Sequence, residues 1–147
     1  MQYQVPGSID TPAELVGRTV ADVMLRQPKT LPVTASVAEA RAALYDDHVH
    51  VVLLVDDGIL AGAVDRTDLT GAPDSAPALE HAVLDGRTVV PTAAAEEARQ
   101  LLLATGRRRL AVMDEDGTLL GLLCLKRRRT GFCSDADVAA RAGAGGR

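Results

Sequence analysis

Apolar and polar positions along the chain follow helical spacing in some segments and strand-like runs in others, and this succession is met twice. Three apolar residues after Ser36 recur at the i, i+3, i+7 spacing of one helix face: Val37, Ala40 and Leu44. With Ser36 as the N-cap, they predict a helix through about Tyr45. Its counterpart is Ala94 to Thr105, which Gly106 ends in the usual C-terminal position.

Short apolar runs separated by turn residues predict three strands in each half. They are Thr30–Val33, Val51–Asp56 and Ile59–Val64, then Thr88–Pro91, Leu110–Asp114 and Thr118–Leu123. Asp57-Gly58 and Asp116-Gly117 each predict a two-residue hairpin turn. Two short helical segments, Thr19–Met24 and Leu79–Leu84, precede the first strand of each half. Each half therefore has the order β-α-β-β with flanking helices, which places the chain in the α/β class.

The two halves also match in sequence, which indicates an internal duplication. KTLPVTASVAEARAAL at Lys29–Leu44 matches RTVVPTAAAEEARQLL at Arg87–Leu102, and VLLVDDGILAG at Val52–Gly62 matches LAVMDEDGTLLG at Leu110–Gly121. We therefore predict a flexible N-terminal segment (1–14), a first repeat (15–74), a second repeat (75–133) and a C-terminal tail (134–147). Within the tail, Ser134–Arg141 suits a short helix and Ala142–Arg147 a disordered end.

Composition limits the classes of function. Of the 147 residues, 47% are hydrophobic but only 2% are aromatic, so Val, Leu and Ala must build the core, which argues against an aromatic platform for RNA or sugar. The net charge of −4 disfavours nucleic-acid binding. Neither a membrane span nor a signal peptide is recognisable, which favours a cytoplasmic protein without membrane contact. Two cysteines are too few for a disulfide framework and are read as reduced thiols.

The repeated unit resembles a CBS domain. The likeness rests on a short helix ending in Val-Met, a strand with proline, a Ser-Val-x-Glu-Ala helix, a strand ending in Asp-Asp-Gly, then Gly-x-Val and Asp-x-x-Asp-Leu. It covers roughly Leu15 to Arg129 and is met twice, as in the tandem pair called a Bateman module, here of the stand-alone bacterial type. The resemblance implies two β-α-β-β-α repeats related by pseudo-twofold symmetry. It also implies a cleft between their sheets that binds adenosine-containing ligands: AMP, ADP, ATP, S-adenosylmethionine or NAD.

The resemblance assigns a ribose-binding role to Asp68. In ligand-binding members, the strand after the hairpin ends in Gly, two apolar residues, Ser or Thr, two further residues and Asp, and Gly62 to Asp68 matches this pattern. A carboxylate suits the two hydroxyls of a ribose. Asp65 replaces the hydroxyl residue and would repel phosphate, while Arg66 and Thr67 complete the candidate loop. The same Asp-Arg-Thr-Asp run also makes a good helix cap, and the two interpretations stay open.

The second repeat departs from the motif. Arg127 stands at the aspartate position, and an arginine has only donors, so this site is lost, altered or reduced to supplying cations. Members often carry phosphate-binding residues before the buried strand, where this chain has His50 in the first repeat and Arg108 and Arg109 in the second. The alternatives are a solvent-facing histidine and a charged loop. By the same resemblance, three residues line the base pocket: Thr30, Leu31 and Pro32.

No catalytic motif is recognisable, so we predict no enzyme, no required cofactor and no metal site. The resemblance implies a regulatory sensor that binds an adenosyl ligand, forms a homodimer and acts on an unidentified protein target. The main alternative is a structural or partner-binding protein that has lost nucleotide binding, for which Asp65 and Arg127 argue. A more distant hypothesis is a thiol function of Cys133, favoured by Arg127 to Arg129 nearby, although a lone cysteine is usually inert.

Overall fold

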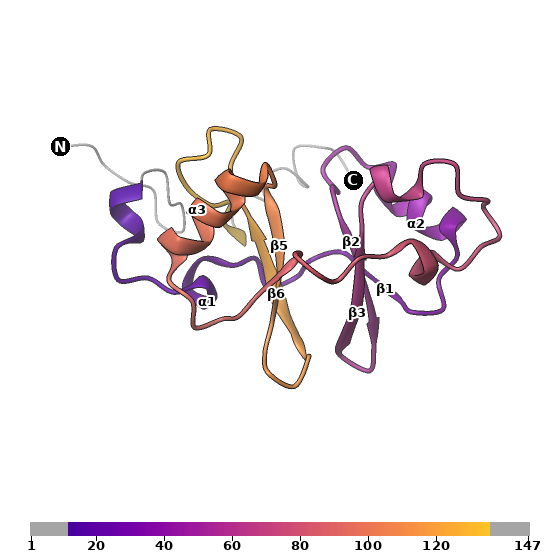
Figure 1. Cartoon of the computed structure of the whole chain (residues 1–147), viewed down its shortest axis with the longest axis horizontal. Coiled ribbons are helices and arrows are strands. Elements are labelled where there is room, and N and C mark those ends of the chain that lie inside the picture. Colours follow the sequence, from indigo (N-terminus) through magenta and orange to yellow (C-terminus); the bar gives the residue numbers. More distant parts are fainter. Residues whose placement is uncertain (1–11, 136–147) are drawn as a thin grey trace. The chain divides into compact units, whose positions relative to one another are not determined.

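The computed structural model describes residues 12–135 and contains two three-stranded sheets, ordered β1-β2-β3 and β4-β5-β6 (Figure 1). The strands are β1 (Thr30–Pro32), β2 (Val52–Asp56), β3 (Ile59–Val64), β4 (Thr88–Val89), β5 (Arg109–Met113) and β6 (Leu119–Cys124). The α-helices are α1 (Val20–Val23), α2 (Val37–Leu44) and α3 (Ala95–Thr105), and the 3₁₀ turns are η1 (Pro12–Leu15), η2 (Thr67–Leu69) and η3 (Ala78–His81). The predicted α/β class is confirmed. The predicted terminal segments fall almost entirely outside the described residues.

The turn of the β5–β6 hairpin is longer than the turn of the β2–β3 hairpin. In the β2–β3 turn, Asp57 has φ 50° and Gly58 has φ 82°, as a two-residue turn with both residues left-handed requires. In the β5–β6 turn only Gly117 has a positive φ, 87°, and the Asp114 carboxylate accepts hydrogen bonds from the Asp116 and Thr118 N–H groups at 3.0 and 2.9 Å. The predicted two-residue turn is therefore wrong at Asp116-Gly117, where the loop is longer and Asp114 holds it.

Helix α2 begins and α3 ends as the sequence predicts. The Ser36 hydroxyl accepts a hydrogen bond from the Glu39 N–H at 3.1 Å, and the Glu39 carboxylate accepts one from the Ser36 N–H at 2.9 Å, which completes a capping box. Helix α3 ends at Gly106, whose φ is 71°. The predicted helix Leu79–Leu84 is only the 3₁₀ turn η3, because the chain turns extended at Ala82 in order to pair with β3.

The chain forms two compact units that do not follow the order of the repeats. Among the described residues, unit 1 comprises residues 12–27, 89–112 and 120–135, and unit 2 comprises residues 28–88 and 113–119. Each unit therefore combines the strands of one repeat with the segment that leads into the other repeat. The tip of the β5–β6 hairpin belongs to unit 2, where the Leu60 N–H donates to the Gly117 carbonyl and the Leu119 N–H to the Gly58 carbonyl, both at 2.9 Å.

The exchanged segments are held by equivalent bridges in the two units, which extends the duplication from sequence to structure. These bridges are Thr19–Ala94 and Leu25–Leu122 in unit 1, and Ser36–Pro77 and Val83–Ala63 in unit 2. Two repeated glycines mark where the segments cross the strands. A Cβ on Gly121 would lie 2.8 Å from the Met24 sulfur, and one on Gly62 would lie 2.7 Å from the Ala82 Cβ. A larger residue at either position would displace the segment.

Each unit has its own aliphatic core. In unit 1, α1 and α3 pack with β5 and β6 around buried residues that include Val20, Leu102, Val112, Leu123 and Phe132. In unit 2, α2 packs on β2 and β3 around residues that include Val37, Leu44, Leu54, Val64 and Leu69. Burial of these apolar side chains is the main favourable contribution to folding. None of the helices within residues 12–135 is long and apolar enough to cross a membrane.

Candidate functional site

The candidate site lies at one edge of the β1-β2-β3 sheet. Antiparallel pairing of Val52 with Val64 brings the end of β3 beside the start of β2, and parallel pairing of Thr30 with Leu53 brings the start of β1 to the same edge. At this edge His50 lies two residues before the start of β2, and Asp65 directly follows the end of β3. The structure thus gathers the predicted residues of the first repeat within unit 2.

Asp65 and Asp68 bind each other's backbone at this edge. The Asp65 N–H donates to Asp68 Oδ2 at 2.8 Å, and the Asp68 N–H donates to Asp65 Oδ1 at 2.9 Å. This reciprocal pattern fixes the start of the turn η2, as a capping box does at a helix start. The cap interpretation is therefore realised in the structure, while the ribose-binding role of Asp68 stays a prediction.

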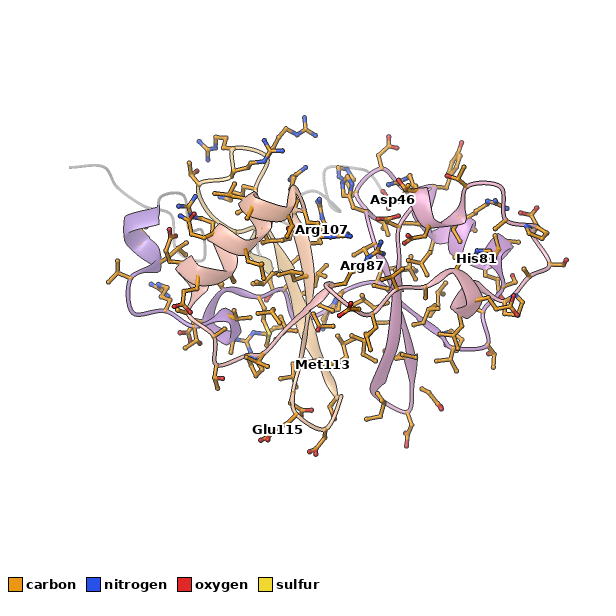
Figure 2. All side chains as sticks on the ribbon, viewed as in Figure 1. Asp46, His81, Arg87, Arg107, Met113 and Glu115 are labelled. Carbon is orange, nitrogen blue, oxygen red and sulfur yellow. The ribbon has the colours of Figure 1, made fainter. Side chains whose placement is uncertain are left out.

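A buried arginine, Arg87, occupies both oxygens of the Asp68 carboxylate. Arg87 is labelled in Figure 2. Its Nη1 donates to Asp68 Oδ2 at 2.6 Å and its Nη2 donates to Asp68 Oδ1 at 3.0 Å, a fork-to-fork geometry that binds tightly. Nη1 also donates to the Ala63 carbonyl at 3.1 Å, and Nη2 lies 3.6 Å from Asp65 Oδ2. The side chains of Arg87 and Asp68 are only 9% and 13% exposed. The Arg87 Nε is buried and has no hydrogen-bond partner among the described residues.

The ion pair keeps both partners charged. Burial opposes ionisation of Asp68, but the hydrogen bonds from Arg87 and from the Asp65 backbone prevail and lower the pKa of the Asp68 carboxyl. The hydrogen bond to Asp68 likewise raises the pKa of the Arg87 guanidinium above its usual value, against the effect of burial. Two carboxylates therefore share one guanidinium, and the cluster carries an excess of negative charge.

Sequence reasoning missed Arg87 as a site residue. Its position matches Lys29, since both precede the threonine that begins the first strand of a repeat. A basic residue at the same place in both repeats is the one feature of the sequence that could have indicated a role for Arg87. Its destination was not predictable from the sequence alone, because Arg87 reaches the first repeat's strands only through the segment exchange that places residues 28–88 in one unit.

Arg66, predicted for the same loop as Asp68, binds elsewhere in unit 2. The Arg66 guanidinium donates to the Leu44 carbonyl and, at 3.0 Å, to the Asp46 carbonyl, so it covers the end of α2. Thr67 is exposed and begins the turn η2. On β1, Leu31 packs partly against the unit 2 core, whereas Thr30 and Pro32 are exposed.

The basic residues predicted from the second repeat belong to unit 1. Arg108 Nε donates to the Leu125 carbonyl at 3.2 Å, and Arg127 is exposed. Burial lowers the pKa of the Arg109 guanidinium, while the neighbouring Cys124 sulfur favours its charged form. The predicted site residues therefore form two groups, one in each unit.

The structure defines a duplicated α/β module in which each repeat's leading segment packs on the other repeat's strands. The model of the CBS domain matches residues 20–75 and 84–127 of this chain. The chain belongs to the CBS domain family, of which it holds two copies.

Solved structures agree with this assignment. The protein CBSX2, determined in complex with AMP, is 26% identical, with a TM-score of 0.66 over 86% of this chain and 99% of that chain. A CBS domain protein from Pyrobaculum aerophilum, complexed with AMP, is 22% identical, with a TM-score of 0.64 over 85% of this chain and 98% of that chain. The second likeness shows the fold alone. No curated protein sequence matches the chain significantly.

Proposed function

We propose that this chain is a non-catalytic regulatory module that binds an adenosine-containing ligand at the β3–η2 edge of unit 2. The observation that carries the proposal is the AMP complex of CBSX2, a protein matched over 99% of its length at 26% identity. Asp68 supplies the chemistry expected of a ribose acceptor, since it is a carboxylate held by the backbone at the end of β3. The candidate ligands are AMP, ADP, ATP, S-adenosylmethionine and NAD.

Binding of a ribose requires Asp68 to release Arg87. The two N–H donors of Arg87 lie 2.6 and 3.0 Å from the two Asp68 oxygens, and a vicinal diol offers two donors in a similar arrangement. The diol therefore competes with the guanidinium. A displaced Arg87 would be a cation with an unsatisfied Nε, suited to a ligand phosphate. Asp65 still opposes a highly charged polyphosphate, which favours AMP or S-adenosylmethionine over ATP.

A thermal-shift panel with the five candidate ligands tests the proposal. A ligand at 100 times its dissociation constant should stabilise the fold by about 2.7 kcal/mol. Asp68→Asn should abolish the shift produced by the active ligand. Asp74→Asn is the matched control, because Asp74 pairs with Arg41 elsewhere in unit 2, and it should leave the shift unchanged. Absence of a shift with every ligand would contradict the proposal.

Arg87→Met separates the competition from the binding itself. Adenosine has the ribose but no phosphate. In the variant its ribose hydroxyls no longer compete with Arg87 for Asp68, and the missing guanidinium removes no phosphate contact. We expect the Arg87→Met variant to bind adenosine more tightly than the wild type in calorimetry. Equal affinity would refute the competition while leaving the ligand assignment intact.

A structural or partner-binding role is the second candidate. The observation that favours it is the Asp68–Arg87 pair, which satisfies both carboxylate oxygens without a ligand. Under this alternative the ligand panel gives no shift, and Asp68→Asn lowers only the stability of the fold.

We further propose that the module acts as a homodimer on a protein target. Sedimentation equilibrium tests the homodimer through the mass of the native species.

A further inference from the structure

The two cysteines of the chain lie directly opposite each other at the end of β6. The chain continues past β6 and turns back, so that Leu125 and Phe132 form an antiparallel bridge. The Cys133 N–H donates to the Cys124 carbonyl at 2.7 Å, and the Lys126 N–H donates to the Gly131 carbonyl at 2.8 Å. These bonds place Cys124 and Cys133 in register as a cross-strand pair. Their sulfur atoms are 3.0 Å apart.

The backbone geometry of this pair suits a disulfide. The two bonds flank Leu125 and Phe132, so Cys124 and Cys133 occupy a hydrogen-bonded position of the ladder. Residues facing each other at such a position have Cα atoms about 5.5 Å apart. Disulfides form most readily at Cα separations of about 5.5–6 Å. The Cα spacing typical of this position therefore lies within the range that a disulfide spans.

A cation lies beside the sulfurs. The Leu125 N–H donates to the Arg108 carbonyl at 2.8 Å, a register that places Arg109 of β5 opposite Cys124 of β6. Burial lowers the pKa of the Arg109 guanidinium, and the neighbouring Cys124 and Cys133 sulfurs oppose that effect. A neighbouring guanidinium stabilises a thiolate, which is the form of cysteine that attacks oxidants.

We propose that Cys124 and Cys133 form a reversible dithiol–disulfide modification site that responds to a small peroxide. We assign the first attack to Cys133, which is 7% exposed against 3% for Cys124 and lies two residues before the exposed Asp135. Its thiolate attacks one peroxide oxygen, the O–O bond breaks, and a sulfenic acid and a hydroxide form. The Cys124 sulfur then attacks the sulfenic sulfur, the S–S bond forms, and a second hydroxide leaves.

The reaction is balanced. The two thiols lose two electrons and two protons, the protons join the two hydroxides, and hydrogen peroxide becomes two waters. A dithiol reductant reverses the modification by thiol–disulfide exchange. The disulfide would fasten the segment from Leu125 to Phe132 to β6. That segment carries the exposed cations Arg127, Arg128 and Arg129, so oxidation would restrict a basic surface.

Peptide mapping of the full chain after mild treatment with hydrogen peroxide tests the proposal. The chain has two cysteines, so a disulfide within one chain has a single connectivity. Trypsin cleaves between them at Lys126 and at the three following arginines, so the two cysteine peptides stay together only if a disulfide joins them. We expect the intact mass to fall by two hydrogen atoms, the linked peptides to appear, and dithiothreitol to restore both thiols.

Three variants separate this pathway from nonspecific oxidation. Cys124→Ala should retain a sulfenic acid at Cys133 that dimedone traps, whereas Cys133→Ala should react far more slowly. Arg109→Met should slow disulfide formation several-fold relative to the wild type. The wild type should melt several degrees higher when oxidised, and neither cysteine variant should show this shift. Thiols that both stay open to alkylation after peroxide, or a disulfide found only between chains, would overturn the proposal.

Discussion

The Asp68–Arg87 pair should contribute measurably to stability, because both charges are largely removed from water. Asp68→Asn keeps the shape of the side chain but leaves Arg87, whose side chain is 9% exposed, without its main countercharge. Removing one partner of a fully buried ion pair costs about 3–5 kcal/mol. Here Asp65 stays 3.6 Å from Arg87 and the Ala63 carbonyl still accepts one N–H at 3.1 Å, so we expect a smaller loss, about 2–3 kcal/mol.

Urea unfolding followed by circular dichroism measures this loss. With a denaturant slope of about 2 kcal/mol per molar, the midpoint of Asp68→Asn should fall by about 1–1.5 M. Asp74→Asn, which disrupts an exposed pair in the same unit, should lose less than about 1 kcal/mol. The double variant Asp68→Asn with Arg87→Met should be more stable than the sum of the single losses predicts, since it leaves no unpaired buried charge. An Asp68→Asn midpoint equal to that of the wild type would refute the reasoning.

Three further predictions concern pH, packing and helix capping. Because the pKa of Asp68 is lowered in the folded state, its contribution to stability is complete above the unfolded pKa of about 3.9 and is lost as the pH falls through the lowered pKa. The urea midpoints of the wild type and of Asp68→Asn should therefore differ at pH 7 and converge at low pH. Gly121→Ala should lower the melting temperature, at a cost of about 1–3 kcal/mol, because the new Cβ would clash with the Leu25 backbone carbonyl oxygen and lie 2.8 Å from the Met24 sulfur. An unchanged melting temperature would show that the exchanged segment packs elsewhere. Ser36→Ala should lower the free energy of unfolding in urea by about 1 kcal/mol. Ala94→Ser should raise it by about 0.5–1 kcal/mol, because it creates at α3 the capping box that α2 already has; a change of the same sign in both variants would contradict the capping geometry.

The sequence was informative wherever local chemistry decides local structure. The cap at Ser36, the end of α3 at Gly106 and the left-handed turn at Asp57-Gly58 all follow from side chains that act on their own backbone. The helix predicted at Leu79–Leu84 was wrong because Val83 pairs with Ala63, a contact distant in sequence that local propensity does not contain.

The candidate site was predictable only in part. The motif placed Asp65 and Asp68 at the end of β3, and the structure confirms that position. Arg87 was missed because the packing of its segment on the first repeat's strands is a property of the tertiary fold. The same holds for Cys124 and Cys133, because only the return of the chain after β6 brings these two thiols together.

Calorimetric titration with AMP and with its 2′,3′-dideoxy analogue tests the central claim most directly, since the two ligands differ only in the hydroxyls assigned to Asp68. Hydrogen bonds to a charged group contribute about 1.5–3 kcal/mol each. We therefore predict that AMP binds the wild type at least about tenfold more tightly than the dideoxy analogue. In Asp68→Asn this preference should largely disappear. Equal affinity of the wild type for AMP and for its dideoxy analogue would contradict the account.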